Sequence, residues 1–240
     1  MNNSPGKGKP LYSMFNRIPG RYDRMNRLLT LSFDERWRKE GAGLCLQDRP
    51  ERVLDLCTGT GDLALRLARM SEKGTEVHAL DFSENMLDLA RMKAAKKDVL
   101  EKITFHHEDA SAMSFPDDYF NSIGIAFAFR NLTFRNPLTG RALKEIYRVL
   151  QPGGRFVIME SSRPDSKFMN ILFRIYMNIM VKHLGGMISG HKTAYNYLAY
   201  SAIHFHTNRE IQDMLSGAGF SMIRSDPKLM GAAAVHIAVK

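Results

Sequence analysis

The sequence predicts an α/β fold built on an open sheet, and two runs of residues carry that prediction. The run RVLDLCTGTGD, residues 52–62, joins a short apolar stretch to a glycine-rich turn and a helix start. The run VHALDFSENML, residues 77–87, adds a second apolar stretch that ends in a carboxylate. A short apolar stretch bounded by a charge and a turn is typical of a strand covered on both faces.

The first strand is expected at Val53–Leu56, with a turn at Thr58–Gly61. Glycine allows positive φ and a close approach of the backbone to a ligand. A helix is predicted over Asp62–Met70, because its apolar residues recur on one face. The free N–H groups at the start of that helix would face a polar or anionic ligand group.

The second strand ends at Asp81, where a carboxylate would accept hydrogen bonds from both hydroxyls of a ribose. This is how an open α/β sheet holds an adenine nucleoside. Two alternatives stay open. Gly59, Gly61 and Ala64 also satisfy the dinucleotide-binding fingerprint, and Asp81 would serve as a helix cap because Ser83 follows it closely.

Three further strands are expected at Ile103–His107, Ser122–Phe127 and Arg155–Glu160. A helix over Thr139–Leu150 ends where proline begins the turn Gln151–Gly154. An acidic residue after the third strand and a PGG turn before the fifth resemble the S-adenosylmethionine-dependent methyltransferase fold. That resemblance implies a Rossmann-like, mostly parallel seven-stranded sheet with helices on both faces and a small helical cap.

Four segments resemble one family, the ubiquinone/menaquinone biosynthesis C-methyltransferases. They are YDRMN at 22–26 with Trp37 downstream, FAFRNL at 127–132, RVLQPGGRFVIMESS at 148–162 and SGHKTAYNYLAYS at 189–201. The sequence departs from the family pattern mainly on the substrate side, at Thr30, Asp34, Ala126, His183, His191 and Ala199. The acid at 34 is more similar to menaquinone-type members, and the identity of the quinone is the part these departures leave open.

The resemblance implies S-adenosylmethionine as the cofactor and no metal. The glycine turn would surround the methionine moiety, Asp81 would bind the ribose, and the acid after strand three would read the adenine amino group. The predicted cofactor-binding residues are Asp55, Thr58, Gly59, Thr60, Gly61, Asp81, Phe82, Met86, Asp109, Ala110 and Ala126.

Methylation at carbon requires an electron-rich carbon, which a quinol supplies once a phenol proton is lost. Arg130 follows the fourth strand and would lower the pKa of that phenol. The other catalytic candidates are Asn131 to orient the ring oxygen, Tyr22 and Tyr195 to contact the ring, and His191 and Asp34 as bases. The alternatives are ordinary ones: Arg130 pairs with a structural carboxylate, Asn131 caps a turn, and the tyrosines belong to the core.

The amino-acid composition limits the classes of binding partner that are expected. The 34 basic and 25 acidic residues give a formal charge of +9, which suits nucleic acid or an anionic bilayer. Since no base-stacking motif accompanies the charge, no nucleic acid is expected. The apolar stretch Phe168–Val181 is interrupted by Arg174 and Asn178, so it is not predicted to span a membrane. It would either pack on the sheet edge or also line a channel for a prenyl tail.

Two cysteines and the lack of an amino-terminal apolar core favour a cytoplasmic protein, with peripheral contact to the inner face of the cell membrane left open. A single domain is expected over 1–240. Its parts are an amino-terminal helical cap (1–50), a cofactor-binding core (51–162), a helical substrate cap (163–207) and a carboxyl-terminal helix with strands (208–240).

The favoured function is C-methylation of a prenylated quinol, either demethylmenaquinol or the ubiquinone precursor, in respiratory quinone biosynthesis. An RNA-modifying or other small-molecule methyltransferase is the alternative, and an idle cofactor-binding module is a third hypothesis. Transient contact with an anionic membrane surface is expected. Oligomeric state stays open, with a homodimer as one outcome.

Overall fold

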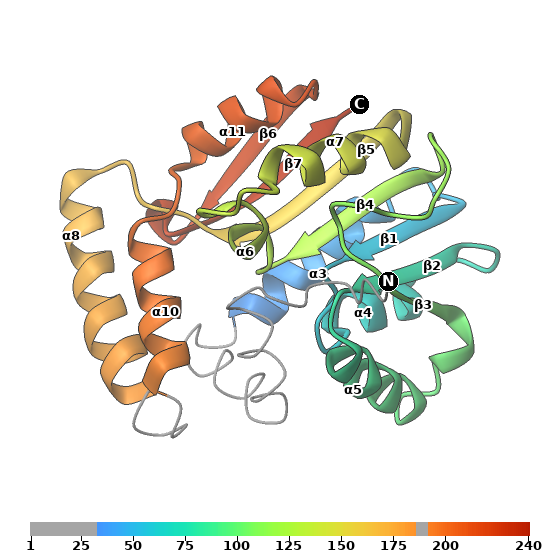
Figure 1. Ribbon diagram of the computed structural model, residues 1–240, viewed down its shortest axis with the longest axis horizontal. Helices are drawn as coiled ribbons and strands as arrows, with labels where there is room; N and C mark the ends of the chain where they lie inside the picture. Colours follow the sequence, from blue (N-terminus) through green and yellow to red (C-terminus); the bar gives the residue numbers. More distant parts are fainter. Residues whose placement is uncertain (1–32, 186–191) are drawn as a thin grey trace.

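The computed structural model describes residues 33–185 and 192–240. Within them, seven strands form one sheet in the order β3-β2-β1-β4-β5-β7-β6 (Figure 1). The strands are β1 (Arg52–Leu56), β2 (Glu76–Asp81), β3 (Ile103–His107), β4 (Phe120–Ala126), β5 (Leu150–Ser161), β6 (Ser221–Lys228) and β7 (Ala233–Val239). The first five are parallel, and β7 runs antiparallel to β5 and β6. The predicted mostly parallel sheet is confirmed.

The predicted strand bounds hold for β3 and need correction for β4 and β5. Strand β5 begins before the PGG turn, because Leu150 already pairs with Phe120. Gly153 then takes a φ of 76° within the strand, and a register shift follows on β4. Pairing that begins across a bulge is a long-range contact, so apolar periodicity alone placed the start of β5 too late.

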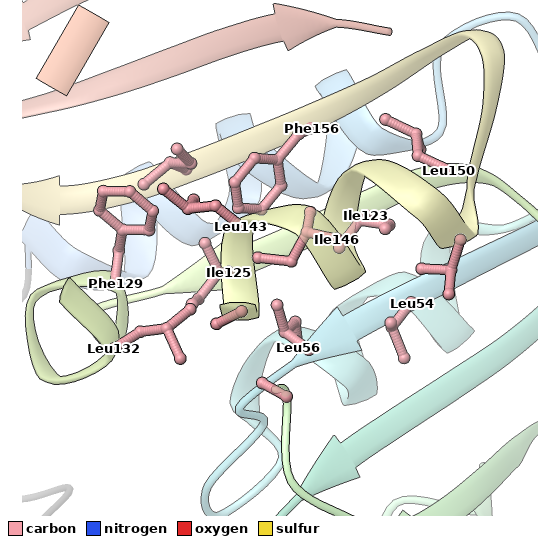
Figure 2. Packing of buried hydrophobic residues seen from close by; sticks show 14 of the residues in the cluster. Leu54, Leu56, Ile123, Ile125, Phe129, Leu132, Leu143, Ile146, Leu150 and Phe156 are labelled. Atoms are coloured by element: carbon pink, nitrogen blue, oxygen red, sulfur yellow. The ribbon is translucent and has the colours of Figure 1, made fainter. Parts of the chain in front are cut away.

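Helices cover both faces of the sheet. They are α3 (Phe33–Cys45), α4 (Asp62–Met70), α5 (Glu84–Ala95), α6 (Phe129–Thr133), α7 (Thr139–Val149) and α11 (Asn208–Gly217), with 3-10 turns η1 (Leu100–Lys102) and η3 (Leu229–Gly231). Alternate strand residues point to opposite faces. Leu54 and Ile123 therefore pack with Leu143 and Ile146 of α7 in one cluster (Figure 2), which residues of α11 also join. Val53 and Val157 pack with α3 and α4 in another cluster.

A separate pair of helices lies beyond the end of β5. Helix α8 (Lys167–Tyr176) continues into the π-helical segment η2 (Met177–Gly185), which packs on α10 (Lys192–Ile203). Figure 1 shows α8 and α10 together at the left of the view, away from the sheet. No residue of α8 is buried, so the alternative in which this helix packs on the sheet edge is wrong. These helices fall within the predicted cap at 163–207, and the boundaries of the predicted parts remain a prediction.

Two glycines on α3 allow a matched test of how that helix docks. A Cβ on Gly41 would overlap Met159 Sδ and lie 2.7 Å from its Cε, whereas a Cβ on Gly43 would meet nothing within 4 Å. Both Gly→Ala changes gain about 1 kcal/mol of helix propensity. We therefore expect Gly41→Ala to be less stable than Gly43→Ala by about 1–3 kcal/mol in urea unfolding, because the core at Met159 is overpacked. Equal stabilities would contradict this packing.

Candidate active site

The strand order reverses between β1 and β4, and a polar cleft opens at the carboxyl ends of the strands around that point. Residues that follow β1, β2, β3 and β4 line it. All the predicted cofactor residues except Gly61 are among them, and so are Arg38, Asp62 and Asn131. The sequence therefore named about half of the lining, namely residues in segments at or directly after strand ends.

Asp55, at the end of β1, organises the loop that follows it. Its Oδ2 accepts hydrogen bonds from Thr58 Oγ1 and from the backbone N–H of Ala64 at 2.8 Å. Cys57 and Gly59 both take left-handed backbone conformations, with φ of 55° each. A Cβ on Gly59 would meet nothing within 4 Å, so this glycine leaves open space for a ligand.

Asp81, at the end of β2, holds two loops at once. Its Oδ2 accepts a 2.8 Å hydrogen bond from the N–H of Gly59, and its Oδ1 accepts a 2.9 Å bond from the N–H of Ser83. The N-cap residue of α5 is Ser83 rather than Asp81, so the helix-cap alternative for Asp81 is not borne out. The bond to Gly59 adds a link that local sequence did not show. The backbone N–H of Phe82 is a third donor to Asp81. A carboxylate has about four lone-pair sites, so these bonds still leave acceptor capacity towards the cleft.

Gly61 is not among the residues that line the cleft, and its part in cofactor binding stays a prediction. It has a φ of 85°, and a Cβ there would lie 2.8 Å from the Cβ of Ala90 on α5. Its role is the close approach of α4 to α5. At the far end of the cleft, Asp109 Oδ1 accepts hydrogen bonds from the N–H and the hydroxyl of Ser111, and Ala110 is buried beside it.

Burial dominates the electrostatics of the two strand-end carboxyls. It raises the pKa of Asp55 to about 7 and that of Asp81 to about 6. The hydrogen bonds from Thr58 and Ala64 oppose the shift at Asp55, and those from Gly59 and Ser83 oppose it at Asp81. Both groups consequently change charge near neutral pH when the cleft holds no ligand.

A second cavity, of about 390 Å³, lies next to the cleft and is mainly apolar. Helix α8 with η2, helix α10 and the turn η3 supply about half of its wall, and α3 supplies another part. The apolar lining includes Trp37, Met169, Leu172, Phe173, Tyr176, Met177, Val181, Leu198, Ala202, Leu229 and Met230. Its polar lining residues are Asp34, Arg38, Arg130, Glu160 and Ser161. The alternative in which the methionine-rich helix lines a channel is thus the one supported.

Arg130 is 5% exposed and lies among these polar residues. Its Nη1 donates a 2.6 Å hydrogen bond to Ser161 Oγ and lies 3.7 Å from Glu160 Oε1, while its backbone N–H donates to Glu160 Oε2 at 2.9 Å. The predicted alternative of a structural carboxylate partner is therefore correct in part. Within the described residues, however, the buried Nε has no hydrogen-bond partner. A buried guanidinium N–H without an acceptor is costly unless a ligand satisfies it.

Arg38 lines both cavities, as does Phe127. The guanidinium of Arg38 forms a buried ion pair with Asp34 and lies 5.0 Å from the centroid of the Phe127 ring. Phe127 itself has a φ of 56° directly after β4, a strained conformation that places its ring at this junction. Sequence reasoning missed Arg38, and the signal was its spacing of four residues from Asp34 on one helix.

The predicted catalytic residues do not all lie in one place. Asp34 and Arg130 line the apolar cavity and Asn131 lines the polar cleft, whereas Tyr22 and His191 lie outside the described residues. Tyr195 lines neither cavity and packs with Met177 and Val181, and its predicted contact with the substrate ring stays a prediction.

Tyr197 follows Tyr195 by two positions on the same helix. Burial raises the pKa of Tyr197, and the charges of Arg130 and Glu160 also act on it. In 33–185 and 192–240, no cluster of side chains is suited to hold a metal, and no helix has the length and hydropathy needed to cross a bilayer.

The raised pKa of Asp55 predicts how the stability of the protein depends on pH. Between pH 3.8 and about 7, the folded protein holds a proton that the unfolded chain has released, so stability falls as pH rises. The amide introduced by Asp55→Asn cannot titrate. The unfolding free energy of this variant relative to wild type should therefore rise with pH in this window, by up to about 1.4 kcal/mol per pH unit. Urea unfolding across the window measures it, with Asp98→Asn on an exposed turn as control. A flat difference would refute it.

Comparisons with known proteins agree with this geometry. The chain is 42% identical to the demethylmenaquinone methyltransferase of Thermus thermophilus over 93% of this chain and 98% of that protein. It is 36% identical to the ubiquinone/menaquinone biosynthesis C-methyltransferase of Geobacter sulfurreducens over 98% of this chain and 90% of that protein. A SAM dependent methyltransferase from Aquifex aeolicus has the same fold, with a TM-score of 0.58 at 20% identity over 86% of this chain and 88% of that one. The family model for ubiE/COQ5 methyltransferases matches residues 5–240, and the chain belongs to that family.

Proposed function

We propose that this protein transfers a methyl group from S-adenosylmethionine to a ring carbon of a prenylated quinol in respiratory quinone biosynthesis. The quinol is demethylmenaquinol or the corresponding ubiquinone precursor. The names of the two relatives support the reaction class. The observation that carries the proposal is the junction of a polar cleft and an apolar cavity at Arg38 and Phe127. Arg130 lines that cavity, and its Nε has no hydrogen-bond partner among the residues that the structure describes.

The polar cleft fits the cofactor. When bound, S-adenosylmethionine supplies an electrophilic methyl group on a sulfonium. Asp81 would accept from the ribose hydroxyls, and Asp109 with Ala110 would lie at the adenine. The loop at Thr58–Thr60 and Asp55 would surround the methionine moiety. Phe82, Met86 and Ala126 would complete the wall.

The apolar cavity fits a reduced ring with an isoprenoid tail. Its methionines and aromatic residues adapt to a flexible chain, and its polar side chains would lie at the ring. Because the site is buried, a positive charge there has a larger effect than it would in water. Arg130 would donate through Nε to a ring oxygen and so favour the phenolate that makes the ring carbon nucleophilic.

The remaining candidates are positioned around that ring. Asn131 lines the cleft side and would orient a ring oxygen. Asp34 lies in the apolar cavity, paired with Arg38, and is the candidate proton acceptor within the described residues. Tyr22 and His191 stay candidates from the sequence alone. Contact with an anionic membrane surface belongs to the same proposal, because a prenylated quinol is drawn from a bilayer.

Product analysis tests the function directly. Labelled S-adenosylmethionine is incubated with reduced, short-tailed demethylnaphthoquinol or demethylbenzoquinol, and mass spectrometry locates the label. We expect a methyl group on a ring carbon of at least one of the two substrates. Methylation of RNA alone, lost steeply as salt rises, would support the RNA-modifying alternative instead. Cofactor binding with no transfer to any substrate would indicate an idle module.

The role of Arg130 is tested with its partner also neutralised. Replacing Arg130 alone would leave Glu160 buried without its ion pair, which typically costs about 3–5 kcal/mol. The double variant Arg130→Met, Glu160→Gln avoids that charge. We expect its turnover of a short-tailed quinol to fall about 100-fold, with cofactor affinity by calorimetry little changed. The pH–rate profile should also move to higher pH, because the phenol loses a neighbouring cation.

The single variant Glu160→Gln is the matched control, since it keeps the guanidinium in the cavity. If the double variant turns over as fast as this control at saturating quinol, Arg130 has no part in the chemistry.

A further inference from the structure

Helix α8 and its continuation η2 have two apolar faces. The inner face includes Met169, Phe173 and Met177, which line the apolar cavity. The outer face carries Phe168, Ile171, Ile175 and Ile179, which are 68%, 58%, 50% and 54% exposed. A helix that needed only one apolar face to pack would have a polar outer face. A contiguous row of exposed large apolar residues marks an interaction surface.

The turn η3 adds two more exposed apolar residues. Leu229 and Met230 are 50% and 74% exposed, and both have left-handed backbone conformations, with φ of 45° and 53°. Consecutive left-handed residues other than glycine cost conformational energy. In this turn the strained backbone holds two apolar side chains at the surface rather than in the core. The turn lies beside the start of the α8 segment, since a Cβ on Gly231 would lie 3.5 Å from Pro164.

These two surfaces meet at the mouth of the apolar cavity. Leu229 and Met230 line that cavity although they are exposed, and Leu172 of α8 does the same at 43% exposure. Residues that both line a cavity and face the exterior bound its opening. The cavity therefore opens between α8 and η3, on the surface that carries the exposed apolar row.

The charged residues along α8 and η2 are positive. Lys167, Arg174 and Lys182 are exposed along α8 and η2, and no acidic residue occurs between Ser166 and Lys182. The chain as a whole has a formal charge of +9. An amphipathic helix with an exposed apolar face and flanking cations is suited to the interface of an anionic bilayer, where both parts are stabilised.

We propose that Phe168, Ile171, Ile175, Ile179, Leu229 and Met230 form a docking face that inserts into the surface of an anionic lipid bilayer. The prenyl tail would then pass from the bilayer between α8 and η3 into the cavity without crossing water. This inference rests on the proposed function for the identity of the tail. The occupant of the face is a lipid surface, and a second copy of the chain is the alternative that the experiment must separate.

The experiment measures co-sedimentation of the full chain with vesicles of phosphatidylcholine, with and without phosphatidylglycerol. The test variant is Ile171→Gln, Ile175→Gln, which changes exposed residues outside the cavity lining. The matched control is Met70→Gln, Met92→Gln, which removes two exposed apolar side chains, 41% and 56% exposed, from α4 and α5. A third variant, Lys167→Gln, Arg174→Gln, tests the charges.

We expect wild type and the methionine control to bind anionic vesicles equally. The isoleucine variant should bind them more weakly, by a factor of about ten or more. The charge variant should lose the preference for phosphatidylglycerol. Turnover of a long-tailed quinol in vesicles should fall with the isoleucine variant, while turnover of a short-tailed quinol stays unchanged. Unchanged vesicle binding by the isoleucine variant, or no binding by wild type, would overturn the proposal.

A concentration-dependent dimer in sedimentation velocity that only the isoleucine variant abolishes would also overturn it, because the face would then be covered by a second copy. The vesicle assay contains neither quinol nor cofactor. Its failure is thus separate from a failure of the proposed reaction, which product analysis reports.

Discussion

The site depends on how the Asp81 carboxylate is satisfied. A buried carboxylate is stable only where donors reach it, and here the N–H groups of Gly59 and Ser83 do so. These bonds tie the loop after β1 to the loop after β2, so the floor of the cleft is one hydrogen-bonded unit. The glycine-rich turn and Asp81, which lies 22 residues after Gly59, are therefore one hydrogen-bonded structure and not two independent motifs.

The second cavity depends on helices that stand away from the sheet. Because α8 does not pack on the strands, space remains between it, α10 and the end of β5. Apolar side chains fill most of that wall, and the ion pairs Asp34–Arg38 and Arg130–Glu160 lie in the same cavity. The stacked Arg38 and Phe127 border both spaces. Two chemically different ligands can thus meet at one junction while each stays in its own environment.

Local patterns predicted what depends on local structure. The strand ends at Leu56 and Asp81 and the polar cleft followed from apolar runs and glycine turns, because those segments need no distant partner to be identified. What local patterns could not show concerns tertiary contacts. Gly61 serves the packing of α4 on α5, Tyr195 belongs to a helix-pair core, and Arg38 reaches the junction only through the docking of α3. Spacing on a helix does not reveal which cavity a face will meet.

Charge provides the final argument about what the cleft holds. Four carboxyl groups line it, those of Asp55, Asp62, Asp81 and Asp109. Asp62 is paired with Lys93 at 2.7 Å, and Arg38 is paired with Asp34, so Asp81 and Asp109, with Asp55 when it is ionised, supply the negative charge of the lining. A dinucleotide would bring an anionic diphosphate to this acidic lining, and an RNA strand would bring more negative charge still. S-adenosylmethionine carries a sulfonium and an ammonium against a single carboxylate. The cleft of this basic protein is locally acidic, and that reversal favours a cationic cofactor over either anionic ligand.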